Sequence, residues 1–361
     1  MASIIPPIPW PTQNYLATQS SVPAFTAAHT LDATTDQFEL HFRAVEAATI
    51  TQVVLRVNAI TGTPGTARIG IQSSSATTGA ASGTWLGATN TGYADVTSYG
   101  TAGTCLTVTL GESVTVARGD CFVIVVDPQA TGTWDASNSI ALTYSAVGGL
   151  QERVPYSVLN GTKTATVIGV GGYRTASRSY GDIVETISNV NPTSASTPDE
   201  LALKWTLPAI CDTYQVVGAR ITANYTAGRT FTLRLYDSDG TTVLQSIDID
   251  TDQGIAGQGT HDFFFDETTL STLSAGTAYR LSYLPGASSA GTISTWTTPT
   301  SADMDAMTGG GAMYSTRTDA GAWTDTATQM PCFQVLISDM SVSGGGGGGG
   351  GAQIFAAGVV R

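Results

Sequence analysis

Charged residues are scarce in this chain, and lysine is the scarcest of them. Charged side chains make up 12% of the 361 residues, and only Lys163 and Lys204 are lysines. The runs of Glu, Lys, Leu and Gln that exposed helices use are missing. Acidic residues outnumber basic ones by 28 to 15, which gives a formal net charge of −13. Because such a surface repels phosphate backbones, we expect no nucleic-acid partner.

Long hydrophobic runs are also missing. No apolar segment reaches the length of a membrane span, so we expect no membrane partner. Residues 1–11 have no basic start and no uninterrupted apolar stretch, which argues against an ordinary signal peptide. The sequons at Asn160 and Asn224 would matter only in a secreted eukaryotic protein.

Cysteine is too rare for a disulfide scaffold. The four cysteines are Cys105, Cys121, Cys211 and Cys332, and the absence of a CxxC pair argues against a structural zinc site. Cys211 and Cys332 open the first and last expected core strands of the second half, which often lie side by side in sandwiches. A disulfide between them is one interpretation, and buried free thiols are the preferred one.

Residues for nucleophilic or acid–base catalysis are equally sparse. The three histidines are His29, His41 and His261, and neither a GxSxG motif nor a phosphate-binding glycine loop accompanies them. His41 and His261 point opposite to the apolar residues of their strands, so we expect both at the surface. The sequence therefore predicts no catalytic residue, no cofactor and no metal ligand, and we expect a protein that is not an enzyme.

One stretch of sequence occurs twice. Residues 116–128 read as a strand end, a tight turn, an alternating apolar strand and a proline stop, and residues 273–285 repeat the pattern 157 positions later. The matched positions are Gly119 and Gly276, Phe122 and Tyr279, Ile124 and Leu281, and Pro128 and Pro285. A second pair of segments, 56–71 and 220–235, matches at an offset of 164. Register kept in strands and gaps confined to loops are typical of diverged tandem modules.

The fold class that follows is all-β, with two tandem antiparallel β-sandwich domains of jelly-roll type. Alternating segments such as 37–43 and 201–207 predict matching first strands, with one face toward the core. Short strands with frequent turns indicate a sandwich, and long crossover loops favour a jelly roll. The expected parts are an extended arm (1–24), a first module (25–188), a linker (189–198), a second module (199–341) and a tail (342–361).

The two ends of the chain carry apolar residues outside both modules. Prolines keep the arm extended, and eight glycines, 344–351, precede the last ten residues. The arm is either a strap laid into a neighbouring subunit or a segment folded onto its own domain, and the tail suggests a plug into a partner. The candidate partner-binding residues are Ile4, Ile5, Ile8, Trp10, Ile354, Phe355, Val359 and Val360.

Other motifs have a functional and a structural interpretation. Asp248, Asp250 and Asp252 resemble the opening of a calcium loop, but we favour a solvated acidic strand edge. The tripeptide 118–120 spells Arg-Gly-Asp, and we interpret it as a turn. Four tryptophans fall in or beside loops, where they could stack on sugars, although core or rim packing is the favoured reading: Trp85, Trp134, Trp296 and Trp323.

Taken together, the modules and the two ends resemble a tailed-bacteriophage virion surface protein. The residues that carry the resemblance are Gly119–Pro128, Gly276–Pro285 and Gly344–Gly351. The resemblance implies a non-enzymatic structural protein of the virion, a head decoration or a head or tail fibre attached through its terminal segments. Its partners would be other capsid or tail proteins, copies of itself and a host surface glycan. A glycan-binding adhesin or receptor-binding module is the alternative.

Overall fold

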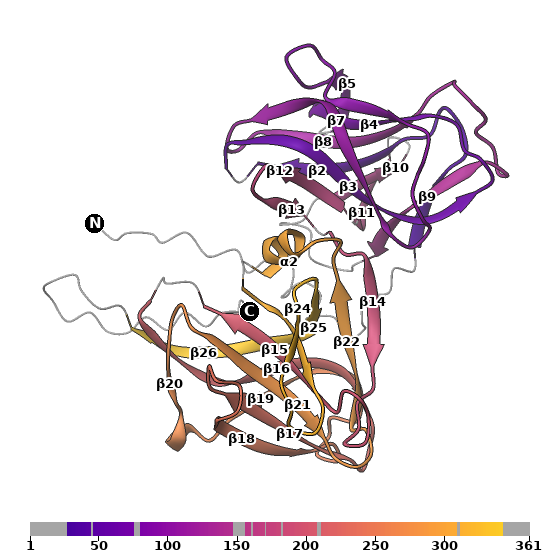
Figure 1. Cartoon of the computed structure of the whole chain (residues 1–361). Helices are drawn as coiled ribbons and strands as arrows, with labels where there is room; N and C mark the ends of the chain where they lie inside the picture. The colour runs from indigo at the N-terminus through magenta and orange to yellow at the C-terminus, as the bar shows by residue number, and fades with distance from the viewer. Residues whose placement is uncertain are drawn as a thin grey trace, which may run out of the picture. The chain divides into compact units, whose positions relative to one another are not determined.

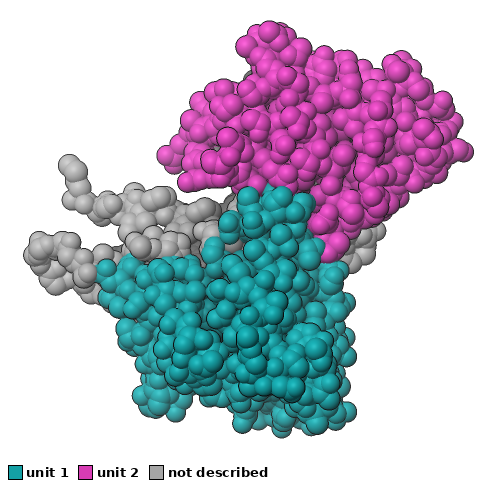
Figure 2. Space-filling view, in the orientation of Figure 1, with its two compact units in different colours: residues 1–23, 187–361 teal, residues 24–186 magenta. Residues whose placement is uncertain are grey.

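Strands account for 59% of the residues that the structure describes and helix for 3%, which confirms the all-β prediction. The structure is a computed structural model (Figure 1) and describes residues 27–44, 46–75, 80–146, 156–159, 162–169, 171–181, 183–207, 211–308 and 311–341. These residues divide into two units, the first within 24–186 (magenta in Figure 2) and the second from 187 onward (teal). We refer to them as the first and second modules.

The first module is built from thirteen strands. They are β1 (Ala27–Leu31), β2 (Phe38–Arg43), β3 (Ala48–Thr61), β4 (Ala67–Ser74), β5 (Ala81–Trp85), β6 (Tyr93–Val96), β7 (Cys105–Val116), β8 (Cys121–Pro128), β9 (Ser139–Ala146), β10 (Tyr156–Leu159), β11 (Thr162–Gly169), β12 (Gly171–Thr175) and β13 (Ser179–Gly181). The strands form two layers with the orders β1-β9-β3-β7 and β2-β8-β4-β5, and the chain alternates between the layers except at β4, β5 and β6, which follow one another in the second layer. This interleaving is the strand order of a jelly roll.

The second module repeats this order. Its elements are β14 (Thr186–Val190), β15 (Glu200–Thr206), β16 (Thr213–Tyr225), β17 (Thr230–Tyr236), β18 (Val243–Asp250), β19 (Gly257–Phe264), η1 (Glu267–Thr269), β20 (Thr272–Ser274), β21 (Ala278–Pro285), β22 (Gly291–Thr297), α2 (Ser301–Thr308), β23 (Met313–Arg317), β24 (Thr324–Thr326), β25 (Gln329–Pro331) and β26 (Phe333–Ser341). The two layers have the orders β14-β22-β16-β19 and β15-β21-β17-β18. The predicted jelly-roll type therefore holds for both modules.

Strand register confirms the residue matches made from the sequence. Leu40 lies opposite Ile124 in the first module, and Leu203 lies opposite Leu281 in the second. Phe122 lies opposite Phe42 in the same way that Tyr279 lies opposite Trp205. Phe122 and Tyr279 are both buried. The two segments therefore occupy the same strand of the same fold, as the duplication argument predicts.

In both modules further strands follow the last strand of the jelly roll, which is β9 in the first module and β22 in the second. In the first, β10 pairs with β2 and β12 pairs with β3. In the second, β23 pairs with β15 and β26 pairs with β16. One difference concerns β11, which pairs with both β9 and β10 and thereby joins the two layers. Two short strands, β24 and β25, take its place in the second module and leave the layers as separate sheets.

The expected linker is shorter than the segment 189–198. Residues 186–190 form β14, which pairs with β22 at the edge of the sheet, as β1 pairs with β9 in the first module. The sequence of β14, Thr-Ile-Ser-Asn-Val, has little apolar alternation because an edge strand with one solvated side does not need it. The connection between β14 and β15 is therefore residues 191–199.

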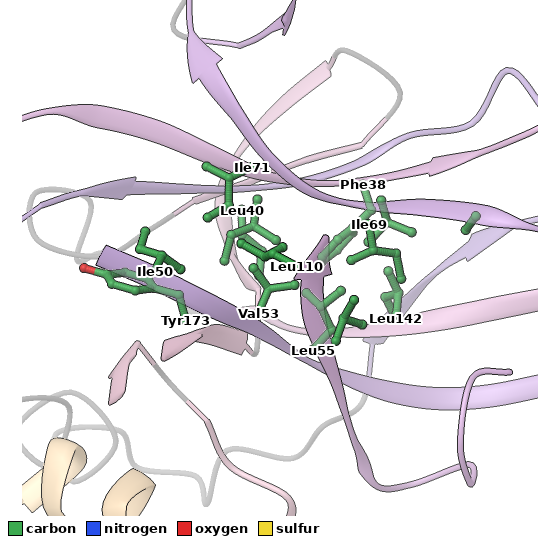
Figure 3. Close-up of a cluster of buried hydrophobic side chains, with 14 of the residues drawn as sticks. Phe38, Leu40, Ile50, Val53, Leu55, Ile69, Ile71, Leu110, Leu142 and Tyr173 are labelled. Atoms are coloured by element: carbon green, nitrogen blue, oxygen red, sulfur yellow. The ribbon is translucent and has the colours of Figure 1, made fainter. Parts of the chain in front are cut away.

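Apolar side chains from both layers fill each sandwich. The first core contains aliphatic residues from β2, β3 and β4, with Tyr173 of β12 at one end (Figure 3). The labelled members are Phe38, Leu40, Ile50, Val53, Leu55, Ile69, Ile71, Leu110, Leu142 and Tyr173. The second core is more aromatic, and its buried Trp205 donates from Nε1 to the hydroxyl of Tyr214 at 3.1 Å. That bond satisfies a buried donor that would otherwise cost free energy.

Candidate functional site

Several charged side chains of the second module form one hydrogen-bonded group on the outer face of one sheet. Along β15, Leu201 and Leu203 point into the core, so Glu200 and Lys204 point to the opposite face. Neighbouring strands contribute to the same face, and the β23–β24 connection covers it. We call this set the outer polar cluster: Glu200, Lys204, Arg234, Tyr236, Arg280, Ser282, Ser315, Arg317, Trp323 and Asp325.

Glu200 lies at the centre of one half of the cluster. Arg317 donates from Nε to Oε2 of Glu200 at 2.6 Å. Oε1 accepts from Ser282 at 2.5 Å and from Tyr236 at 3.1 Å. The Arg317 and Glu200 side chains are 5% and 3% exposed, so this is a buried ion pair. Its desolvation cost is offset only because further hydrogen bonds complete both groups.

Asp325 organises the other half. Lys204 donates to its Oδ2 at 2.6 Å, and Ser315 donates to its Oδ1 at 2.7 Å. Arg280 reaches the same carboxylate at 3.2 Å and donates to Ser315 at 3.1 Å. Burial opposes ionisation of Asp325, but these hydrogen bonds and the Arg280 charge outweigh it, so the pKa of Asp325 lies below its ordinary value.

Trp323 links the two halves. Its ring lies 4.5 Å from the Arg317 guanidinium carbon and 5.4 Å from that of Arg280. Its Nε1 donates to the Gly240 carbonyl oxygen at 2.7 Å, in the turn between β17 and β18. These contacts fix an indole that is only partly buried. The cluster thus holds the β17–β18 turn and the β23–β24 connection together over the sheet, and the Trp323 ring lies where the two meet.

The cluster belongs to the second module alone. By register, Arg280 and Ser282 correspond to Val123 and Val125 of β8, which are fully buried. Both oxygens of Glu200 accept hydrogen bonds from neighbouring side chains, which hold the carboxylate in place. Sequence reasoning missed these residues. A usable signal was that each of four strands carries one basic residue on the side opposite to its core-facing residues.

The predicted partner-binding residues lie outside the described part of the chain. They are Ile4, Ile5, Ile8, Trp10, Ile354, Phe355, Val359 and Val360. Their proposed role therefore stays a prediction.

The tryptophans differ in their placement. Trp296 is buried, and Trp134 packs against the first core. Trp85 lies against Tyr93 with ring centroids 5.0 Å apart. Core or rim packing thus describes these three, and Trp323 is the one held by charged groups.

The histidine prediction is wrong for His41, which is 7% exposed. His41 does point away from the core, but its Nε2 lies 3.0 Å from Oε2 of the buried Glu39. The backbone amide of Ala81 donates to the same Glu39 oxygen at 2.9 Å, because the start of β5 lies beside this face. His261 is half-buried against Tyr225.

The acidic strand is a solvated edge, as favoured from the sequence. Asp248, Asp250 and Asp252 are exposed, and β18 is the last strand of its sheet. Asp252 accepts from the Gly228 amide at 2.6 Å, so it also holds the neighbouring turn. The Arg-Gly-Asp tripeptide is likewise a turn, in which Asp120 accepts from the Ala117 amide at 2.7 Å.

All four cysteines are free thiols. The preferred interpretation is confirmed for Cys211 and Cys332, which are both buried. A bridge between them is prevented by strand direction. Because β26 runs antiparallel to β16, Cys332 lies beside Thr222, whereas Cys211 precedes the other end of β16.

Neither a metal-binding cluster nor a membrane-spanning helix occurs in the described ranges. No three His, Cys, Asp or Glu side chains there lie close enough together to hold a metal ion. No helix in this part of the chain is long and apolar enough to cross a membrane. Comparison with protein-family models, with curated proteins and with solved structures finds no match.

Proposed function

We propose that this chain is a non-enzymatic structural protein on the surface of a tailed-phage particle, as a head decoration or a fibre. The observation that carries the proposal is the tandem jelly roll, in which two modules share strand order, register and the strands that follow the jelly roll. Jelly rolls are a common architecture of viral capsid proteins. A surface that is acidic overall also suits a part that does not contact the packaged nucleic acid.

The attachment would use the terminal segments. Each terminus carries four of the apolar candidate residues outside the two modules. Burying each such side chain contributes about 1.5–3 kcal/mol, and repeated contacts in a symmetric assembly add avidity. Other particle proteins and further copies of this chain are the partners.

Quantitative mass spectrometry of purified particles tests the proposal. Peptides of this chain should copurify with the major capsid protein through a density gradient. A high copy number would indicate decoration, and a few copies per particle would indicate a fibre. Recovery of the chain in the soluble lysate, with none in the particles, would overturn the proposal.

Glycan binding is the second proposal, and Trp323 is the observation that favours it. A partly exposed indole lies 5.4 Å from the guanidinium carbon of Arg280, which also binds Asp325, so an aromatic platform is combined with polar groups at fixed positions. A glycan array should give a signal that Trp323→Ala removes and that Trp85→Ala keeps. Equal binding by both variants would exclude Trp323 as the platform.

A further inference from the structure

Phe264 is the most exposed large hydrophobic side chain among the described residues. It is 56% exposed and lies on the outer face of β19, the last strand of its sheet. Its neighbour across the strand pair is Gly218 of β16, and Leu336 of β26 pairs with Gly218 from the other side. Phe264 and the half-buried Leu336 therefore flank a residue without a side chain, and we call these three residues the outer apolar patch.

The first module shows what covers this place. In the duplicated sequence Gly218 corresponds to Val54, which lies 164 positions earlier. Val54 is fully buried, although its side chain does not belong to the apolar core of the first module. Gly172 pairs with Val54, and a Cβ on Gly172 would lie 3.0 Å from Cγ1 of Ile183. Ile183 is itself fully buried, so it lies on the outer face beside Val54.

The residues after Ile183 continue along the same face. Cys105 donates from Sγ to the Val184 carbonyl oxygen at 3.6 Å, and Arg56 donates from Nε to that of Glu185 at 2.7 Å. Arg56 corresponds to Arg220, which lies two residues from Gly218. The segment 183–185, which follows β12 and β13, is thus the cover of the outer face in the first module.

In the second module β26 takes the place of β12, so the residues after Ser341 stand at the position in the chain from which the first module supplies its cover. The apolar pair nearest to that strand is Ile354 and Phe355, separated from Ser341 by twelve residues, 342–353. A glycine-rich tether of this length has an r.m.s. span of about 20 Å. Ser341 pairs with Thr213 and Phe264 with Gly218, so five residues of β16, roughly 17 Å, separate the two places. The r.m.s. span of the tether therefore matches the distance from Ser341 to Phe264.

We propose that Ile354 and Phe355 dock on the outer apolar patch of their own module, as Ile183 and Val184 cover the first module. Apolar contact with Phe264 and Leu336 removes an exposed aromatic side chain from water. Of the four C-terminal candidates, the docking would leave Val359 and Val360 for attachment to the particle, a step that rests on the proposed function. The docking itself does not depend on a particle.

Site-specific photo-crosslinking of the full-length chain tests the docking. A benzoylphenylalanine at position 264 keeps an aromatic ring in place, and the same probe at Val243, which is 43% exposed on another sheet, is the matched control. Trypsin leaves residues 318–361 in one peptide, because no Lys or Arg lies between Arg317 and Arg361. Fragment ions then separate a cross-link to Leu336 from one to residues 354–355.

The expected result is a cross-link from position 264 to residues 354–355, and none from position 243. The double variant Ile354→Ser, Phe355→Ser should lower that product at least about tenfold, while the cross-link to Leu336 persists as an internal standard of folding. Isotope-labelled and unlabelled chains are mixed before irradiation. Products that join the two isotopes would show exchange of the segment between copies and overturn docking within one chain. A cross-link to Leu336 alone, or equal yields from the two probe positions, would also overturn the proposal.

Discussion

The backbone amide of Gly119 donates a hydrogen bond to the carbonyl oxygen of Ala44, with 2.7 Å between the two atoms. The second module has the same bond between Gly276 and Leu207, at 2.8 Å. Ala44 follows β2 and Leu207 follows β15, the strands that pair with the strand after each glycine. Both glycines have positive φ, 92° and 76°. The duplicated turn is therefore closed in the same way in both modules.

Alanine at either glycine should destabilise its module by about 1–2 kcal/mol, because a Cβ disfavours positive φ. Space is not the cause: among the described residues, the only atom within 4 Å of a Cβ at Gly119 is Nη2 of Arg43 at 3.9 Å, and a Cβ at Gly276 meets none. Urea unfolding of Gly119→Ala and Gly276→Ala measures the loss. The Asn variants, which tolerate this backbone better, should lose less. Wild-type stability in both alanine variants would contradict the backbone explanation.

The sequence predicted the parts of the fold that depend on apolar alternation. Leu40 and Ile124 alternate with outward residues, so their strands and their matches in the second module could be read directly. The edge strand β14 could not, because Ser188 and Asn189 are exposed and need no apolar partner. The burial of His41 depends on a segment about 40 residues away, from which Ala81 contacts Glu39. Alternation predicts which face a side chain takes, but not what covers that face.

Replacing Arg317 with Met should cost about 3–5 kcal/mol, because the buried Glu200 carboxylate loses its charged partner. Arg178→Met is the matched control. Its ion pair with Glu46 is open to water, with side chains 65% and 46% exposed, and should contribute about 0–1 kcal/mol. Chemical denaturation of both variants gives the comparison. Equal losses would mean that Glu200 and Arg317 do not stabilise the cluster as a buried pair.

The cysteines should differ in reactivity. Burial raises the pKa of the Cys332 thiol to about 12. Cys121 is exposed at the start of β8. Iodoacetamide at pH 8 should therefore label Cys121 in the folded protein and Cys332 only after unfolding, as peptide mapping would show. In the variant Cys121→Ser, this rapid labelling of the folded protein should disappear. Rapid labelling of Cys332 in the native protein would show that its burial is transient.

The low pKa of Asp325 predicts how the outer polar cluster responds to acid. A carboxyl whose pKa is depressed in the folded state contributes stability that is fully present above its unfolded pKa, about 3.9, and is lost as the pH falls through the folded value. Asp325→Asn should lower the melting temperature at pH 7, where Lys204 and Arg280 lose their carboxylate partner. The difference from wild type should shrink between pH 4 and pH 2, as Asp325 itself becomes neutral. Asp305→Asn, a change at an exposed carboxylate of α2, is the control for the general effect of acid. A difference that stayed constant over this pH range would mean that the charge of Asp325 does not hold the cluster together.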